Sequence, residues 1–174
     1  LADVFLYGTL QHAPLLSVVL GRDAPAAEAA ELRDHDVRAV AGAAYPVLLP
    51  AGGAQAPGAL LRDVSPADLG RLCHYEAVFG YAPRRLPVRG GDGPDRPAHV
   101  FLPDDPPPAA GAWSLAAWEA RWAPLDCEAA VEIMAHFGHL SPSALTAVHD
   151  MIRARAHSRV LARGPRPRAP VVAG

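Results

Sequence analysis

The fold of this chain can be inferred from two stretches of sequence, Tyr7-Gly8-Thr9-Leu10 and Leu72-Cys73-His74-Tyr75-Glu76. The first follows a mostly apolar run from Asp3, which predicts a buried strand ended by Gly8. A glycine and a small residue after a strand let backbone N–H groups turn toward one point, which would make an anion-binding nest. An ordinary strand-ending turn accounts for the same four residues, so both interpretations stay open.

The second stretch closes a predicted helix that runs from about Pro66 to Val78. Ser65 is a good N-cap, a proline follows at the first helical position, and Asp68 adds negative charge to the first turn. Glu76 then stands near the C-terminal end of the helix among aromatic residues. Apolar surroundings and the negative end of a helix both disfavour a charged carboxylate. We therefore expect a raised pKa for Glu76, in the range of a group that transfers protons at neutral pH.

The remaining pattern divides the chain into a strand-rich part and a helical part. Up to about Pro108, short apolar runs alternate with turns rich in Gly and Pro, and three helical patterns follow. This order predicts an α+β protein rather than a doubly wound parallel sheet, because the strands leave little room for crossover helices. The expected strands are 3–7, 37–44, 46–49, 58–62, 81–89 and 98–102, and the expected helices are 14–20, 66–78, 114–122, 126–137 and 143–163.

The composition is that of a folded domain and excludes several classes of function. The chain has 174 residues, 51% of them hydrophobic and 20% charged, with a formal net charge of −2. No overall field therefore attracts nucleic acid or an anionic membrane. The sequence contains no Lys, which excludes Schiff-base and P-loop mechanisms. It also lacks the GxSxG, HExxH, paired CxxC and dinucleotide-binding GxGxxG motifs.

Two pairs of residues suggest a metal or redox role without completing a site. His136 and His139 are three residues apart and can share one helix face, but no third ligand stands at a suitable spacing. Cys73 and Cys127 fit no metal-binding spacing, and we expect two buried thiols rather than a disulfide. No metal and no organic cofactor is therefore expected.

The sequence favours a cytoplasmic protein. No stretch approaches the ~18 apolar residues needed to span a bilayer. The first residues run straight into a predicted strand, without the basic and apolar regions of a signal peptide. We expect no membrane partner.

In combination, these segments resemble the γ-glutamylcyclotransferase-like (AIG2-like) family over roughly residues 4–102. The loop from Tyr7 to Leu10 matches the YGSL or YGTL loop of that family intact. The segment from Leu72 to Glu76 matches its LDxYEG-like helix end, with Cys73 where Asp is common and Ala77 where Gly is common. The resemblance implies a small mixed β-barrel with helices packed around it and a cavity at one barrel mouth.

The resemblance also implies a reaction. The loop would hold the polar end of a small-molecule substrate through backbone amides, and the carboxyl of Glu76 would be the general acid/base. The α-amine of a γ-glutamyl group attacks its own γ-carbonyl and releases 5-oxoproline and a free amine, without a metal or cofactor. We expect one concavity to be lined by Tyr7, Gly8, Thr9, Leu10, Glu76 and Tyr81.

Other interpretations stay open. Glu76 on the convex surface, paired with Arg84 or Arg85, would remove the site. The same barrel could instead be a small-molecule-binding or docking domain without turnover, which the altered Leu-Cys-His-Tyr-Glu-Ala setting favours. A third interpretation is an interaction scaffold in which the three tryptophans of residues 113–122 cover the barrel or a partner. Their spacing favours an intramolecular core.

The helical part lies beyond the family core and resembles an extension of bacterial proteins, some of which continue into a Nudix ADP-ribose pyrophosphatase domain. This chain has no Nudix box of its own. We expect a barrel domain at 1–108, a helical extension packed on it at 109–163, and a Pro/Arg-rich tail or linker at 164–174. The basic face of residues 151–159 is expected to be solvated rather than bound to nucleic acid. We expect a monomer.

Overall fold

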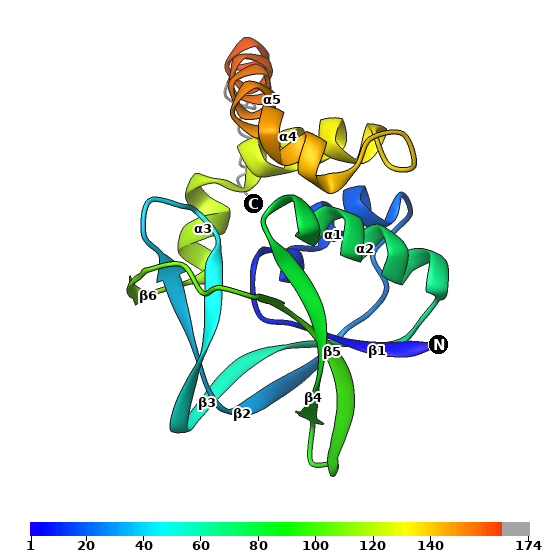
Figure 1. Ribbon diagram of the computed structural model, residues 1–174, viewed down its shortest axis with the longest axis vertical. Coiled ribbons are helices and arrows are strands. Elements are labelled where there is room, and N and C mark those ends of the chain that lie inside the picture. The colour runs from blue at the N-terminus through cyan, green and yellow to red at the C-terminus, as the bar shows by residue number, and fades with distance from the viewer. Residues whose placement is uncertain (165–174) are drawn as a thin grey trace, which may run out of the picture.

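The computed structural model describes residues 1–164, in which strands dominate the first part and helices the second (Figure 1). The α+β class is thereby confirmed. The expected tail, apart from its first residue, lies outside the described residues. In chain order the elements are β1 (Ala2–Leu6), the 3-10 turn η1 (Thr9–Gln11), α1 (Ala13–Leu20), β2 (Glu28–Val40), β3 (Pro46–Val64), α2 (Pro66–Val78), β4 (Tyr81–Gly90), β5 (Asp95–Pro103), β6 (Ala109–Ala112), α3 (Leu115–Arg121), α4 (Ala123–Ala135) and α5 (Pro142–Arg163).

The strands close into a barrel, as the family resemblance implied. Their order is β3-β1-β5-β4-β2, and β2 pairs back to β3, while β6 adds to the outside of β2. Strands β1 and β5 are parallel, and the other pairs are antiparallel. Closure depends on the long pairing of β2 with β3, from Glu28 opposite Leu60 to Ala39 opposite Pro46. Leu60 also lies opposite Phe5 of β1, so β3 is paired along both edges.

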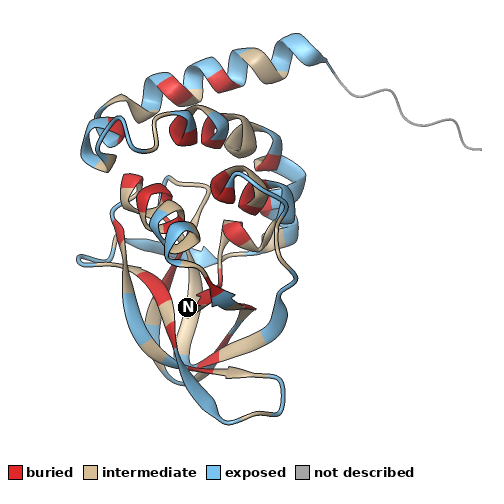
Figure 2. Cartoon of the chain, turned by 90° about the vertical axis from the view of Figure 1, so that its right-hand side faces the viewer, coloured by how far each residue is buried: buried red, intermediate tan, exposed pale blue. Residues whose placement is uncertain are grey.

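Two buried clusters lie on opposite sides of β1. Val4 and Leu6 belong to the cluster shared with the helices, whereas Phe5 and Tyr7 belong to the barrel interior. This alternation is the two-residue period of a strand. Figure 2 shows the buried residues on strands and on the helices above them. Tyr7 is the last residue of this alternating pattern. Its ring therefore lies at the end of the barrel interior, next to the loop that follows β1. The other buried residues of the interior are Leu32, Leu48, Ala56, Leu60, Val88, Ala98 and Val100.

The helices form two layers over one end of the barrel (Figure 1). Helices α1 and α2 lie nearer the strands, α4 packs against α1, and α5 packs against α2 and α4. One apolar cluster joins the layers, with Leu72 of α2 and Ile152 of α5 both fully buried in it. Trp118 of α3 is 2% exposed and belongs to the same cluster, which confirms the intramolecular role expected for it. The division of the chain at residue 108 stays a prediction.

Three parts of the sheet differ from the expected strands. The expected strands 46–49 and 58–62 are a single strand, β3, which runs from Pro46 to Val64. Strand β2 begins at Glu28, whereas we expected it to begin at Val37. Its first half is mostly polar and carries one buried side chain, Leu32, so no hydrophobic period marks it. Strand β6 was expected to belong to the helical part. All four of its residues are exposed, and pairing with β2, where Ala112 lies opposite Arg38, gives it strand geometry.

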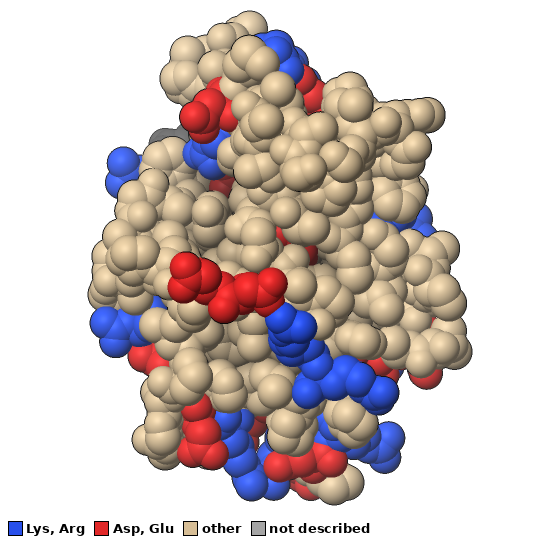
Figure 3. Space-filling model, viewed as in Figure 1, with Lys and Arg blue, Asp and Glu red and all other residues tan. Residues whose placement is uncertain are grey.

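The surface carries charges of both signs, which are mixed on the face shown in Figure 3. Pairing between strands contributes to this mixture, because Arg62 contacts both Asp3 and Glu28. Within residues 1–164, no helix is long and apolar enough to cross a membrane.

Candidate active site

Helix α2 carries Glu76 into the site. Ser65 caps the start of the helix by accepting the amide of Asp68 at 3.1 Å, as its position predicted. The helix occupies Pro66–Val78, and Gly80, with φ of 82°, allows the chain to turn into β4. Glu76 therefore stands in the last turn, at the end that faces the barrel mouth.

The structure brings all six expected residues together around one pocket. Tyr7, Gly8, Thr9 and Leu10 come from the end of β1 and the loop after it, Glu76 from α2 and Tyr81 from the start of β4. The wall also includes other residues around the end of α2 and the start of β3, a residue of β5, and residues of helices α4 and α5. These further wall residues are Tyr45, Pro46, Tyr75, Phe79, Phe101, Asp126, Ala129, Ile133, His149 and Arg153.

The carboxyl of Glu76 is surrounded by protein but reaches the pocket. Its side chain keeps partial contact with solvent through the pocket opening. Burial nevertheless raises the pKa of Glu76 from 4.5 to about 8, and no charge or hydrogen bond within residues 1–164 offsets this shift. Arg84 pairs instead with Asp104. The carboxyl is thus largely protonated at neutral pH and close to the range in which it can exchange a proton.

The loop between β1 and α1 offers backbone donors to the pocket. It forms the 3-10 turn η1, in which the two amides after Leu10 donate back to the carbonyls of Gly8 and Thr9 at 3.1 and 3.0 Å. The amides of Thr9 and Leu10 donate no backbone hydrogen bond in the described part of the chain. Gly8 lets the loop approach Pro46, because a Cβ at this position would lie 3.0 Å from the proline Cγ. The N–H groups are therefore available for a polar ligand group.

Aromatic rings form much of the remaining wall. The phenol of Tyr7 donates to the carbonyl oxygen of Phe101 at 2.7 Å, and that of Tyr81 donates to the carbonyl oxygen of Pro46 at 3.0 Å. Burial raises the pKa of both phenols. Because each hydroxyl gives its one proton to a backbone carbonyl, these rings fix the shape of the pocket, and their raised pKa values keep both phenols protonated at neutral pH.

Helices α4 and α5 supply charged wall residues that the sequence did not predict. Asp126 accepts hydrogen bonds from Nε1 of Trp118 at 2.9 Å and from Nη1 of Arg153 at 2.8 Å. Burial raises the pKa of Asp126 and lowers that of His149. Asp126 and His149 belong to no recognisable sequence motif. The packing of α4 on α5 is what brings them to the pocket.

The basic face of residues 151–159 is partly solvated, since the side chains of Arg155 and Arg159 are 52% and 37% exposed. Arg153 lines the pocket and pairs with Asp126. Arg155 and Arg159 pair with glutamates of α4. These ion pairs could not be predicted from the sequence, because the acidic partners of the arginines lie on α4, more than twenty residues away along the chain.

The pairs considered for metal or redox chemistry do not extend into larger clusters. Between residues 1 and 164, no group of three or more His, Cys, Asp or Glu side chains is arranged to hold a metal ion. Cys73 and Cys127 are free thiols. Both are partly buried, and burial raises the pKa of each.

Solved structures share the fold at low sequence identity. An Arabidopsis thaliana protein, At5g39720.1, has a TM-score of 0.56 and 22% identity, over 68% of this chain and 80% of its own. A second Arabidopsis thaliana protein, At3g28950.1, has a TM-score of 0.56 and 16% identity, over 99% and 94% of the two chains. The uncharacterized Homo sapiens protein loc79017 has a TM-score of 0.52 and 13% identity, over 92% and 98%.

Sequence comparison identifies the family. Curated proteins gave no match. The family model described as "Gamma-glutamyl cyclotransferase, AIG2-like" matches residues 4–119, which include the loop after β1, Glu76 and Tyr81. Because the match spans well over half of the chain, the protein belongs to the gamma-glutamyl cyclotransferase, AIG2-like, family.

Proposed function

We propose that the protein is a cyclotransferase that acts on a γ-glutamyl amine or a related small amide and releases 5-oxoproline. The observation that carries this proposal is the carboxyl of Glu76, which lies in the pocket with a pKa raised to about 8. A free glutamate, with a pKa of ~4.3, would be a weak proton acceptor at neutral pH. Burial makes Glu76 a stronger base and keeps it able to return the proton.

The proposed reaction needs one group that first accepts and then donates a proton. The neutral α-amine of the γ-glutamyl group attacks the γ-carbonyl carbon and forms the ring C–N bond. Glu76, in its ionised form, takes the proton that the attacking amine loses. When the bond to the leaving amine breaks, Glu76 returns a proton to that nitrogen, so the carboxyl ends in its starting state. Acyl transfer with two proton transfers is complete without a cofactor, and the proposal includes none.

The loop after β1 would hold the substrate in place. The unpaired amides of Thr9 and Leu10 favour a negatively charged or polar group, such as the carboxylate of the γ-glutamyl moiety. Holding this end fixes the distance between the α-amine and the γ-carbonyl next to Glu76. Orientation of two groups within one molecule can contribute as much to the rate as the proton transfer itself.

The test compares the wild type with Glu76→Gln on a panel of γ-glutamyl amines, with 5-oxoproline as the measured product. The amide is nearly isosteric but cannot accept the proton, so we expect a loss of roughly 10²- to 10⁴-fold in the chemical step. Asp92→Asn, at an exposed turn, is the matched control and should retain full activity. Equal release by wild type and Glu76→Gln would remove Glu76 from the mechanism.

A binding domain without turnover is the second candidate, with a docking role beside a Nudix hydrolase as one version of it. It is favoured by the departures at Cys73 and Ala77 from the usual motif. Burial raises the pKa of the Cys73 thiol, and the nearby carboxylate of Glu76 adds to this shift. Measurable binding of γ-glutamyl amines by the wild type, with no 5-oxoproline from any of them, would support this candidate over the enzyme.

A further inference from the structure

A second pocket, of about 370 Å³, lies at the opposite end of β1 from the candidate active site. Its wall is made by residues 1–3, by Arg85 of β4 and by three residues of β5, which are Arg96, Pro97 and His99. None of these residues lines the pocket that holds Glu76. The length of β1, roughly 17 Å of extended chain, separates the start of the strand from Tyr7. The two pockets are therefore distinct.

The strands place two of the wall residues side by side. Arg85 of β4 lies directly opposite His99 of β5 in the antiparallel pairing of these strands. Residues directly opposite each other share one face of a sheet, with Cβ atoms about 4.5–5.5 Å apart. His99 also lies beside Val4 of β1, so β5 is paired along both of its edges at this point. Three strands therefore fix the backbone under this pair of side chains before any ligand binds.

Both arginines of this pocket lack a protein partner in the described part of the chain. Figure 3 shows arginine side chains gathered over β4 and β5. Arg84, next to Arg85, pairs with Asp104. Every other arginine of residues 1–164 likewise makes an ion pair, a hydrogen bond to a backbone carbonyl or a contact with an aromatic ring. Arg85 and Arg96 are exposed and make none of these contacts, and they line the same pocket.

The one acidic residue of this wall, Asp3, is already paired with residues outside it. Its Oδ2 accepts a hydrogen bond from Nη1 of Arg62 at 2.7 Å, and its Oδ1 accepts the backbone amide of Asp63 at 3.2 Å. Arg62 is not part of the wall and balances the charge of Asp3. The guanidinium groups of Arg85 and Arg96 therefore give the pocket a net positive charge.

The imidazole of His99 adds a third polar group that the protein does not use. Its Nδ1 is buried and has no hydrogen-bond partner within residues 1–164. A ligand in the pocket can reach the ring through the other nitrogen, Nε2. Two guanidinium groups and an imidazole thus meet in one pocket, with their hydrogen-bonding capacity unused by the protein.

We propose that Arg85, Arg96 and His99 form a binding site for a phosphate group, carried either by inorganic phosphate or by a phosphomonoester. A planar guanidinium can donate two parallel hydrogen bonds to a phosphate. The tetrahedral phosphate has oxygens in several directions and can accept from two guanidinium groups and an imidazole at once. A carboxylate has two oxygens in one plane and satisfies fewer of these donors. The inference does not depend on the proposed function of Glu76.

The test is an NMR titration of the ¹⁵N-labelled protein with sodium phosphate, glycerol phosphate and sodium acetate, at one ionic strength set with NaCl. Both phosphates should shift the amide signals of residues 95–99 to saturation, and acetate should bind more weakly. Arg85→Gln and Arg96→Gln should each weaken phosphate binding roughly 10- to 100-fold, as expected for charged hydrogen bonds. Arg84→Gln removes the neighbouring arginine, which lies outside the pocket wall, and should bind phosphate as the wild type does.

His99→Phe keeps a ring without nitrogens and should weaken phosphate binding roughly 2- to 10-fold, as expected for one uncharged hydrogen bond. Equal affinity for the two phosphates would mean that the site binds the phosphate group alone, and tighter binding of glycerol phosphate would mean that it binds an ester. Both results support the site. No saturable shift, equal binding of acetate, undiminished binding by Arg85→Gln and Arg96→Gln, or an equal loss in Arg84→Gln would each overturn it. Circular dichroism checks that every variant is folded, and the exposed arginine variants suffice if His99→Phe is not.

Discussion

The phenol of Tyr7 donates a hydrogen bond of 2.7 Å to the carbonyl oxygen of Phe101, 94 residues further along the chain. Tyr7 directly follows β1, and Phe101 belongs to β5, the strand that pairs with β1 in parallel. Both residues line the pocket. The hydrogen bond therefore ties the start of the ligand-binding loop to the neighbouring strand and fixes the tyrosine ring at the barrel mouth.

Tyr7→Phe should destabilise the protein by about 1–3 kcal/mol, because it leaves a buried carbonyl without its donor. Tyr45→Phe is the control, since the half-buried Tyr45 hydroxyl has no hydrogen-bond partner in the described residues and its loss should change stability little. Urea unfolding of the three proteins gives the comparison. An equal loss of stability in both variants would contradict a stabilising role for the hydrogen bond from Tyr7 to Phe101. Release of 5-oxoproline should fall less for Tyr7→Phe than for Glu76→Gln.

Gly58→Ala should prevent closure of the barrel or destabilise it by more than about 3 kcal/mol. A Cβ at residue 58 would lie 2.4 Å from the carbonyl oxygen of Leu6 and 2.6 Å from the Phe5 ring, and neither backbone nor a core ring can move aside cheaply. Gly52→Ala, in the same strand β3, meets no atom within 4 Å and should stay within about 0.5 kcal/mol of wild type. Urea unfolding by circular dichroism distinguishes the two, and similar stabilities would contradict the close approach of β1 to β3.

The parts of the fold that could be predicted from sequence are those with local signals. Helix α2 has the bounds expected from Ser65, Pro66 and the glycine that follows it, because caps and first-turn residues act within a few positions. The antiparallel pairing of β4 with β5 follows from the glycine-rich turn between them. The closure of the strands into a barrel was predicted from the family resemblance instead, because no local hydrophobic periodicity in the sequence specifies it.

The unpredicted parts depend on tertiary contacts. The first half of β2 is polar and is a strand because β3 supplies hydrogen-bond partners along its whole length. The charged wall of the pocket is a second case. Arg153 and Arg155 are the same residue type two positions apart, and successive helical residues are rotated by about 100°. Only the packing of α4 on α5 determines which of them faces the pocket and which pairs with Glu132.

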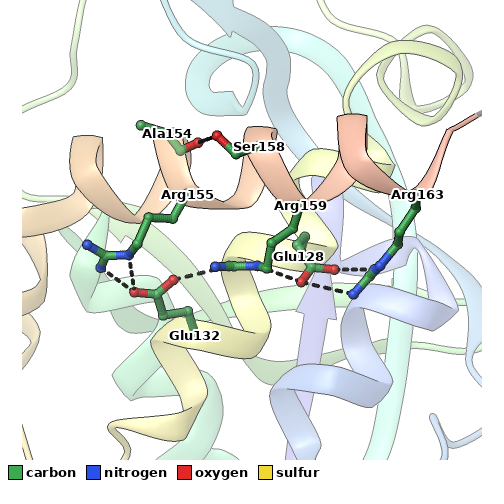
Figure 4. A network of polar contacts seen from close by, with 7 residues as sticks. All are labelled: Glu128, Glu132, Ala154, Arg155, Ser158, Arg159 and Arg163. Atoms are coloured by element: carbon green, nitrogen blue, oxygen red, sulfur yellow. Dashed lines mark hydrogen bonds and ion pairs between the residues drawn. The ribbon is translucent and has the colours of Figure 1, made fainter.

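Glu128→Gln should lower the melting temperature by at most about 3 °C, and the effect should depend on salt. Glu128 contacts Arg159 and Arg163 in the network of Figure 4. These arginines are exposed at the surface, where ion pairs contribute little and are screened by salt. The difference from wild type should be largest at low ionic strength and nearly vanish at about 1 M NaCl. Glu119→Gln, which removes the separate contact with His12, is the comparison on α3. A difference that is the same at both salt concentrations would point to packing rather than charge.

Stability should decrease with pH through the titration of Glu76. The folded-state pKa is about 8, above the ordinary value of 4.5 that the unfolded chain retains. Below the unfolded value, both states hold the proton and the full stability is present. As the pH rises toward 8, the unfolded state releases the proton while the folded state keeps it, so the free energy of unfolding falls. The side-chain amide introduced by Glu76→Gln cannot ionise in either state, so the variant loses no stability through this group.

The expected result is that the stability of Glu76→Gln relative to wild type rises by roughly 3 kcal/mol between pH 5 and pH 8. Urea unfolding of both proteins at pH 5, 6.5 and 8 measures this difference directly. Asp92→Asn removes an exposed carboxyl and should follow the wild type across the same range. The measurement requires no substrate, so it tests the burial of Glu76 independently of the reaction. A difference between wild type and Glu76→Gln that does not change with pH would mean that the carboxyl is solvated as in an unfolded chain, and the proposed base would lose its physical basis.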